Sequence, residues 1–141
     1  MFLEMVKNQD YPQSRMEIII VDDASEESTY QNLQEQHQDP RIRWFRLPEQ
    51  KGPSQARNLG FTLSRGEFIQ YLDSDDTIHP EKLRLQVNAL KASNAQMATA
   101  HWRFVFNLLG VSIPYPVIKT PDNRQDLIIG TASDANWFPV M

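Results

Sequence analysis

The fold class is decided by residues 16–25, which read MEIIIVDDAS. Residues 16–21 form a largely apolar run rich in β-branched side chains, which is typical of a strand buried on both faces of a parallel sheet. The run ends at Asp22 and Asp23, so the strand should carry two carboxylates at its carboxyl end. Ser25 fits the N-cap of a following helix, with acidic residues in the first turn.

Predicted helices and strands alternate along most of the chain. Helices are predicted over residues 2–8, from Ser25 to near Asp39, from Pro53 to Arg65 and from Pro80 onward, and strands over 16–21, 41–47, 67–73 and 96–106. This order is typical of an α/β layered domain with right-handed crossovers, in which ligands bind beyond the carboxyl ends of the strands. From residue 107 onward the pattern predicts a long loop, which could include a short pair of strands.

The composition restricts the class of protein. A chain of 141 residues with 40% hydrophobic and 23% charged residues is typical of one soluble globular domain. Its net charge of −4 argues against broad binding to nucleic acid, and the absence of cysteine excludes disulfides and thiolate metal sites. No apolar run approaches the roughly 20 residues of a membrane span, and no signal-peptide pattern is visible. We therefore expect a cytoplasmic protein, with the inner face of a membrane as a further location.

An acidic cluster follows the third predicted strand. Residues 72–76 read LDSDD and place three carboxylates at the end of strand 67–73. Hard divalent cations such as Mg²⁺ bind carboxylate oxygens and commonly keep substrate phosphates in their other positions. One interpretation is therefore a metal site that faces a diphosphate. The alternative is a helix cap, in which Asp76 or Thr77 is the N-cap of the helix near Pro80.

Two other stretches carry candidate binding residues. Residues 51–60, KGPSQARNLG, form a glycine loop that runs into a helix N-terminus, which is a favourable place for an anion. Arg57 lies one turn into this helix and could pair with a phosphate or with the acidic cluster; in the alternative, the glycines serve the turn and the packing and Arg57 is solvated. Asp22 and Asp23 could accept hydrogen bonds from a nucleobase or ribose, or could cap the following helix.

Three stretches, taken together with their order and spacing, resemble the family 2 glycosyltransferases with the GT-A fold. They read EIIIVDDAS (17–25), KGPSQARNLGFTLSRGEFIQYLDSDD (51–76) and HPEKLRLQV (79–87). The resemblance covers about residues 2–106 and extends loosely to NWFP at 136–139. It implies a three-layer α/β/α domain with a mainly parallel central sheet.

The resemblance also implies how the chain is divided. Residues 1–141 would be a single partial GT-A domain, with a donor-binding core over 1–106 and the start of an acceptor-side region over 107–141. The family's usual first strand and the acidic segment that supplies its catalytic base have no counterpart in this sequence, because neither Asp126 nor Asp134 lies in the family's base motif. We therefore expect a truncated core whose exposed sheet edge could promote self-association.

By resemblance, the activity is transfer of a sugar from a nucleotide-diphospho-sugar to an acceptor hydroxyl, with inversion. UDP is the expected nucleotide, Mg²⁺ or Mn²⁺ the expected cofactor, and a glycan or lipid-linked molecule the expected acceptor in polysaccharide or glycoconjugate synthesis. Position by position, the nucleotide-binding residues would be Asp22, Asp23, Arg57 and Asp73, and the metal ligands Asp75, Asp73 and Asp76. The catalytic base is unknown. The alternative is a non-catalytic module that binds a nucleoside diphosphate or a metal.

Overall fold

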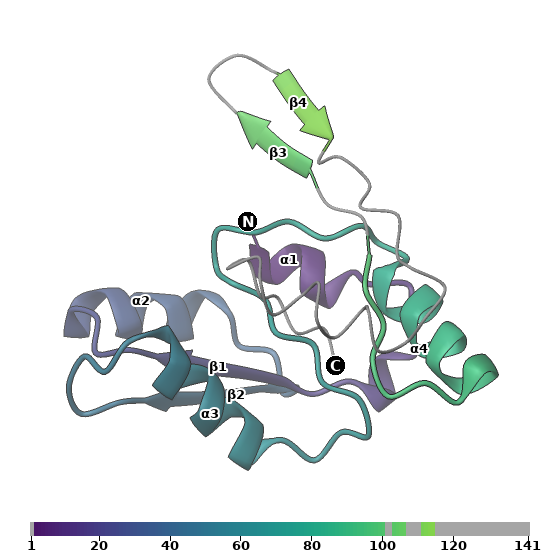
Figure 1. Cartoon of the computed structure of the whole chain (residues 1–141). Coiled ribbons are helices and arrows are strands. Elements are labelled where there is room, and N and C mark those ends of the chain that lie inside the picture. The colour runs from purple at the N-terminus through teal and green to yellow at the C-terminus, as the bar shows by residue number, and fades with distance from the viewer. Residues whose placement is uncertain (1, 101–102, 107–110, 115–141) are drawn as a thin grey trace.

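The computed structural model describes residues 2–100, 103–106 and 111–114 (Figure 1). Its elements are α1 (Phe2–Lys7), the 3-10 turn η1 (Gln13–Arg15), β1 (Ile18–Asp22), α2 (Glu27–Gln36), β2 (Ile42–Arg46), α3 (Pro53–Leu63), α4 (Lys82–Ser93), β3 (Arg103–Phe106) and β4 (Val111–Pro114). β1 and β2 form a parallel pair, and β3 and β4 form a separate antiparallel pair.

One face of the parallel pair carries the hydrophobic core. Ile18 and Ile42 lie opposite each other in the ladder and are buried together with Leu3 of α1. On the same face, the ring of Trp44 in β2 meets the ring of Tyr30 in α2 edge-on, with 6.1 Å between centroids. Alternation along the strands therefore directs one set of side chains towards α1 and α2.

The opposite face is covered by α3. A Cβ atom added to Gly60 would lie 3.7 Å from the Cγ2 atom of Val21 in β1, which is an ordinary van der Waals distance. Figure 1 shows α2 and α3 on opposite sides of the two strands. The predicted three-layer arrangement with a parallel sheet is thus confirmed, with two strands in the sheet among the described residues.

Several predicted elements need correction. The strand predicted over 67–73 is wrong, because only Gln70 forms an isolated bridge and no described residue extends the β1–β2 sheet towards this segment. A β-branched and aromatic run becomes a strand only where a neighbour accepts its hydrogen bonds. The strand predicted over 96–106 is confirmed only over its last four residues, as β3. Its partner β4 lies in the region after residue 107, for which the sequence allows a short pair of strands.

Two helix starts also differ from prediction. α2 begins at Glu27, with Glu26 as its N-cap, rather than directly after Ser25, whose backbone N–H donates to the carboxylate of Asp22 at 3.0 Å. α4 begins at Lys82, with Glu81 as its N-cap, although Pro80 marks the correct region. α3 begins at Pro53 as predicted, since proline suits the first helical position.

A buried glutamine, Gln9, joins the end of α1 to the start of α4. Gln9 is only 3% exposed. Its Nε2 donates to the backbone carbonyls of Met5 at 3.3 Å and His79 at 3.0 Å, and its Oε1 accepts from the backbone N–H of Leu83 at 3.3 Å. The side chain therefore fixes the end of α1 to the start of α4.

A second tie lies at the amino end of β1. The carboxylate of Glu17 accepts from the backbone N–H of Arg65 at 2.5 Å and from Nη1 of Arg43 at 3.1 Å. Nη1 of Arg43 also donates to the carbonyl of Leu63 at 2.9 Å. Burial of Glu17 favours its protonated form, but these hydrogen bonds outweigh burial and lower the pKa of Glu17. These contacts hold the end of α3 to the amino end of β1.

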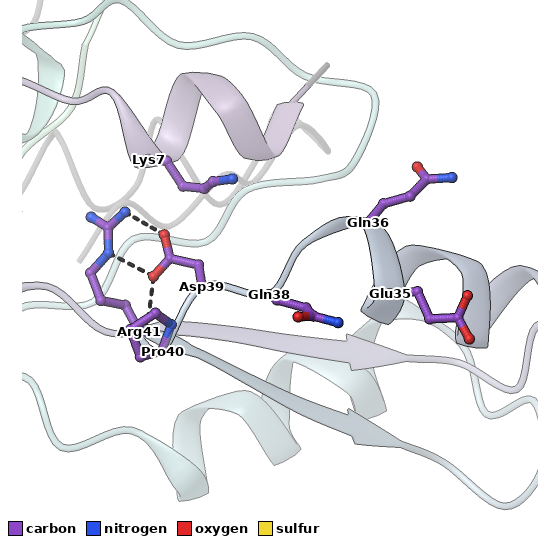
Figure 2. A pocket seen from close by; sticks show the side chains of 7 residues that line it. All are labelled: Lys7, Glu35, Gln36, Gln38, Asp39, Pro40 and Arg41. Atoms are coloured by element: carbon purple, nitrogen blue, oxygen red, sulfur yellow. Dashed lines mark hydrogen bonds and ion pairs between the residues drawn. The ribbon is translucent and has the colours of Figure 1, made fainter.

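The turn between α2 and β2 is closed by Asp39 and Arg41 (Figure 2). The guanidinium of Arg41 donates to both carboxylate oxygens of Asp39, at 2.9 and 2.5 Å, and its backbone N–H donates to the same carboxylate at 2.9 Å. These hydrogen bonds lower the pKa of Asp39 from its ordinary value of 3.8 to about 2. The pair lines a pocket together with Lys7, Glu35, Gln36, Gln38 and Pro40, none of which is a predicted site residue.

Asp39→Asn should destabilise the chain near neutral pH by about 1–2 kcal/mol, because it removes charge-assisted hydrogen bonds to Arg41. Since the pKa of Asp39 is lower in the folded chain, its contribution is present above the unfolded value of 3.8 and is lost as the pH falls towards about 2. Urea unfolding at several pH values should therefore show a shrinking difference from wild type. Glu35→Gln, a change in the same pocket, should show almost no difference. A pH-independent difference for Asp39→Asn would contradict this role.

Gln9→Ala should lower the free energy of unfolding by about 1–3 kcal/mol, because the backbone carbonyl of His79 and the N–H of Leu83 lose their buried partner. Gln36→Ala provides a matched control, since Gln36 is exposed and should change stability by no more than about 0.5 kcal/mol. Denaturant unfolding of both variants measures the difference. Equal effects of the two substitutions would show that Gln9 does not hold α1 to α4.

Candidate functional site

The predicted site residues come from three places in the fold. Asp22 and Asp23 lie at the carboxyl end of β1, and Arg57 lies near the start of α3. Asp73, Asp75 and Asp76 lie in a turn in the stretch between α3 and α4. The structure joins Arg57 directly to Asp73, and it joins Asp23 to the loop before α3.

Asp22 is engaged within the protein. Its Oδ2 accepts the backbone N–H of Ser25 at 3.0 Å and lies 3.2 Å from Nε of Arg46, which is its register partner at the end of β2. The carboxylate thus forms a local turn and an ion pair rather than capping α2. Sequence analysis missed Arg46. The available signal was an acid and a base at the ends of two neighbouring parallel strands.

Asp23 closes the glycine loop. Its Oδ1 accepts the backbone N–H of Lys51 at 2.7 Å, and its Oδ2 accepts that of Gly52 at 2.8 Å. Gly52 has φ 84°, a left-handed conformation that favours glycine. The carboxylate of Asp23 therefore already accepts two amides of this loop, and binding of a ligand anion there stays a prediction. Because each carboxylate oxygen has two lone pairs, Asp23 can still accept a further hydrogen bond from a ligand.

Arg57 bridges α3 and the acidic turn. Its Nη2 lies 2.8 Å from Oδ1 and 2.9 Å from Oδ2 of Asp73, and the two side chains are 33% and 40% exposed. The predicted pairing of Arg57 with the acidic cluster is confirmed, so Arg57 is not a free, unpaired surface cation. One charge of the cluster is thus compensated from α3, at a site that water still reaches.

Asp75 and Asp76 lie exposed beside this pair. Partial burial of its carboxyl raises the pKa of Asp76, and repulsion from the charges of Asp73 and Asp75 raises it further. The helix-cap alternative for Asp76 is wrong, because the N-cap of α4 is Glu81. The turn therefore carries crowded negative charge that does not serve a helix.

The carboxylates of the acidic turn do not already form a metal-binding group. In the part of the chain that the structure describes, no three or more histidine, cysteine, aspartate or glutamate side chains lie close enough to hold a metal ion. Asp126 and Asp134 lie outside the described residues, as does most of the region after residue 106, so the division into donor and acceptor regions stays a prediction. No helix among the described residues is long and apolar enough to cross a membrane.

Several proteins with sequences similar to this chain are named as glycosyltransferases. The sequence model described as "Glycosyl transferase family 2" matches residues 2–128. An uncharacterized glycosyltransferase of Haemophilus influenzae is 33% identical over 135 residues, covering 95% of this chain and 51% of that protein. The succinoglycan biosynthesis protein ExoO of Rhizobium meliloti is 41% identical over 83 residues, covering 59% of this chain and 24% of that protein. This chain thus spans 51% or less of these relatives.

Solved structures agree with the sequence relationship. The crystal structure of Staphylococcus aureus TarS 1-349 superposes with a TM-score of 0.60 at 28% identity, covering 66% of this chain and 28% of that one. The same fragment in complex with UDP superposes equally well. TarS is named as a poly(ribitol-phosphate) beta-N-acetylglucosaminyltransferase. Because the family match covers most of the sequence and the layered fold agrees, the chain belongs to glycosyl transferase family 2 and has the GT-A fold.

Proposed function

We propose that this chain forms the donor-binding part of a transferase that moves a sugar from a UDP-sugar to an acceptor hydroxyl, with inversion. The observation that carries the proposal is the ion pair between Arg57 and Asp73, which lies beside two exposed carboxylates. Support for the nucleotide comes from the UDP complex of TarS. Support for a glycan or lipid-linked acceptor in polysaccharide or glycoconjugate synthesis comes from the names of ExoO and TarS.

Arg57 has the chemistry to contact the donor while it holds the acidic turn. Only Nη2 of its guanidinium is used by Asp73 among the described contacts. The remaining N–H groups form a planar fork that suits a phosphate or a nucleobase carbonyl. Because Arg57 is partly exposed, a donor can reach these groups without breaking the pair. Arg57 would therefore set the distance between the nucleotide and the carboxylates.

A divalent cation, Mg²⁺ or Mn²⁺, fits the acidic turn by donor type. Asp75 would be the principal ligand, with Asp73 and Asp76 beside it, and all three supply the carboxylate oxygens that such cations prefer. Among the described residues, the carboxylates of Asp75 and Asp76 have no hydrogen-bond partner. Partial burial, followed by repulsion from the neighbouring carboxylates, raises the pKa of Asp76. When bound, the cation would stabilise the negative charge of the departing diphosphate. The side chains must turn towards one another to hold it, because they do not yet converge.

The nucleoside would lie at the end of β1. Asp23 has lone pairs left after accepting the amides of Lys51 and Gly52, and these can accept from a base N–H or a ribose hydroxyl. Asp22 would support nucleotide binding indirectly, by holding the local turn, because Arg46 and Ser25 already engage its carboxylate. Deprotonation of the acceptor needs a general base, which we do not assign to a residue. Self-association and a cytoplasmic location also stay predictions.

Calorimetric titration of the full chain with UDP, with and without MnCl₂, tests donor binding. We expect wild type to bind UDP about tenfold or more tightly when Mn²⁺ is present, and Asp75→Asn to lose most of this gain with an unchanged thermal midpoint. Glu67→Gln is the matched control, because Glu67 is exposed and lies outside the acidic turn. UDP binding by wild type that does not depend on Mn²⁺ would contradict the metal role. Binding without any sugar transfer from a panel of UDP-sugars would favour the non-catalytic alternative.

A further inference from the structure

Arg46 holds the loop that follows β1. Its Nε lies 3.2 Å from the carboxylate of Asp22, its Nη2 donates to the carbonyl of Ser25, and its Nη1 pairs with the carboxylate of Glu27. Its guanidinium also lies over the ring of Tyr30, 5.4 Å from the centroid. One side chain from β2 therefore contacts the strand end, the loop and the first turns of α2.

The loop needs such an external support. Ala24 has φ 59°, a left-handed conformation that is unfavourable for a residue other than glycine. The N-cap of α2, Glu26, makes no side-chain hydrogen bond to the helix start. The loop conformation is thus not one that the local sequence prefers. The contacts of Asp22 and Arg46 can offset this cost and keep the loop in one place.

The position of the loop decides the position of Asp23. Asp23 lies between Asp22, which is hydrogen-bonded and ion-paired, and Ala24, which has a left-handed backbone. Its carboxylate accepts the amides of Lys51 and Gly52. Those amides directly precede α3, which carries Arg57. A shift of the loop would therefore displace Asp23 first and the start of α3 with it.

We propose that Arg46 is a positioning residue for the nucleotide side of the donor site. It does not touch the donor; it fixes the loop so that Asp23 can both close the glycine loop and face the nucleoside. This inference rests on the proposed function. An arginine suits the task because its planar guanidinium presents separate N–H groups to two carboxylates and a carbonyl, which the single ammonium of lysine cannot match.

Arg43 offers a matched control in the same strand. It too is ion-paired to a glutamate, Glu17, and it lies over the ring of Phe45 at 5.3 Å from the centroid. Its contacts, however, fix the end of α3 to the amino end of β1, away from the loop after β1. Loss of Arg43 should cost stability without moving Asp23.

The test is calorimetric titration of the full chain with UDP, in the presence and absence of MnCl₂. Arg46→Gln should weaken UDP binding about tenfold in both conditions, so that the ratio between them is unchanged, because the acidic turn keeps its ligands. Arg46→Lys should recover part of the affinity, since it keeps a charge beside Asp22. Arg43→Gln should bind UDP within about twofold of wild type, even if its thermal midpoint falls equally.

The outcomes separate this inference from the proposed function. If wild type does not bind UDP, the proposed function fails. If wild type binds and a folded Arg46→Gln binds within about twofold of it, or if Arg43→Gln weakens binding as much, Arg46 is not a positioning residue. If Arg46→Gln does not fold, Glu27→Gln decides the matter, because Glu27 is 62% exposed and its loss removes one contact of Arg46. We expect about threefold weaker binding for Glu27→Gln, and unchanged affinity would overturn the proposal.

Discussion

The carboxylate of Asp23 accepts the backbone N–H groups of Lys51 and Gly52 at 2.7 and 2.8 Å, and this contact joins the end of β1 to the start of α3. β1 belongs to the sheet and α3 to a helical layer, so the β1–β2 ladder alone does not fix their relative position. From α3, Arg57 reaches Asp73 and fixes the acidic turn in the same way. Asp23 thus positions the start of α3, and Arg57 of α3 positions the acidic turn.

Charge balance along this edge explains where a ligand should bind. Asp22 is compensated by Arg46, Asp23 by two backbone amides, and Asp73 by Arg57. Among the described residues, Asp75 and Asp76 have no such partner, and partial burial together with the charges of Asp73 and Asp75 raises the pKa of Asp76. Surplus carboxylate next to an arginine suits a divalent cation, which the carboxylates can hold and which can in turn bind a diphosphate.

Local signals in the sequence predict β1 and α3 correctly, because a β-branched run and a proline at the first helical turn act within a few residues. Residues 67–73 carry the same kind of signal as β1, yet they form no strand, since a strand depends on a neighbour that the sequence does not reveal. Arg46 and Gln9 were missed for a related reason. Their partners are distant in sequence: the β1–β2 ladder brings Arg46 to Asp22, and the contact between the end of α1 and the start of α4 brings Gln9 to His79 and Leu83.

Backbone amide shifts of the isotope-labelled full chain, recorded on addition of UDP with MgCl₂, would locate the donor most directly. If the diphosphate lies beside the Arg57–Asp73 pair, the largest shift changes should fall on Arg57, on residues 73–76 and on the amides of Lys51 and Gly52. Changes concentrated instead around Asp39 and Arg41, in the pocket near the end of α2, would contradict this placement.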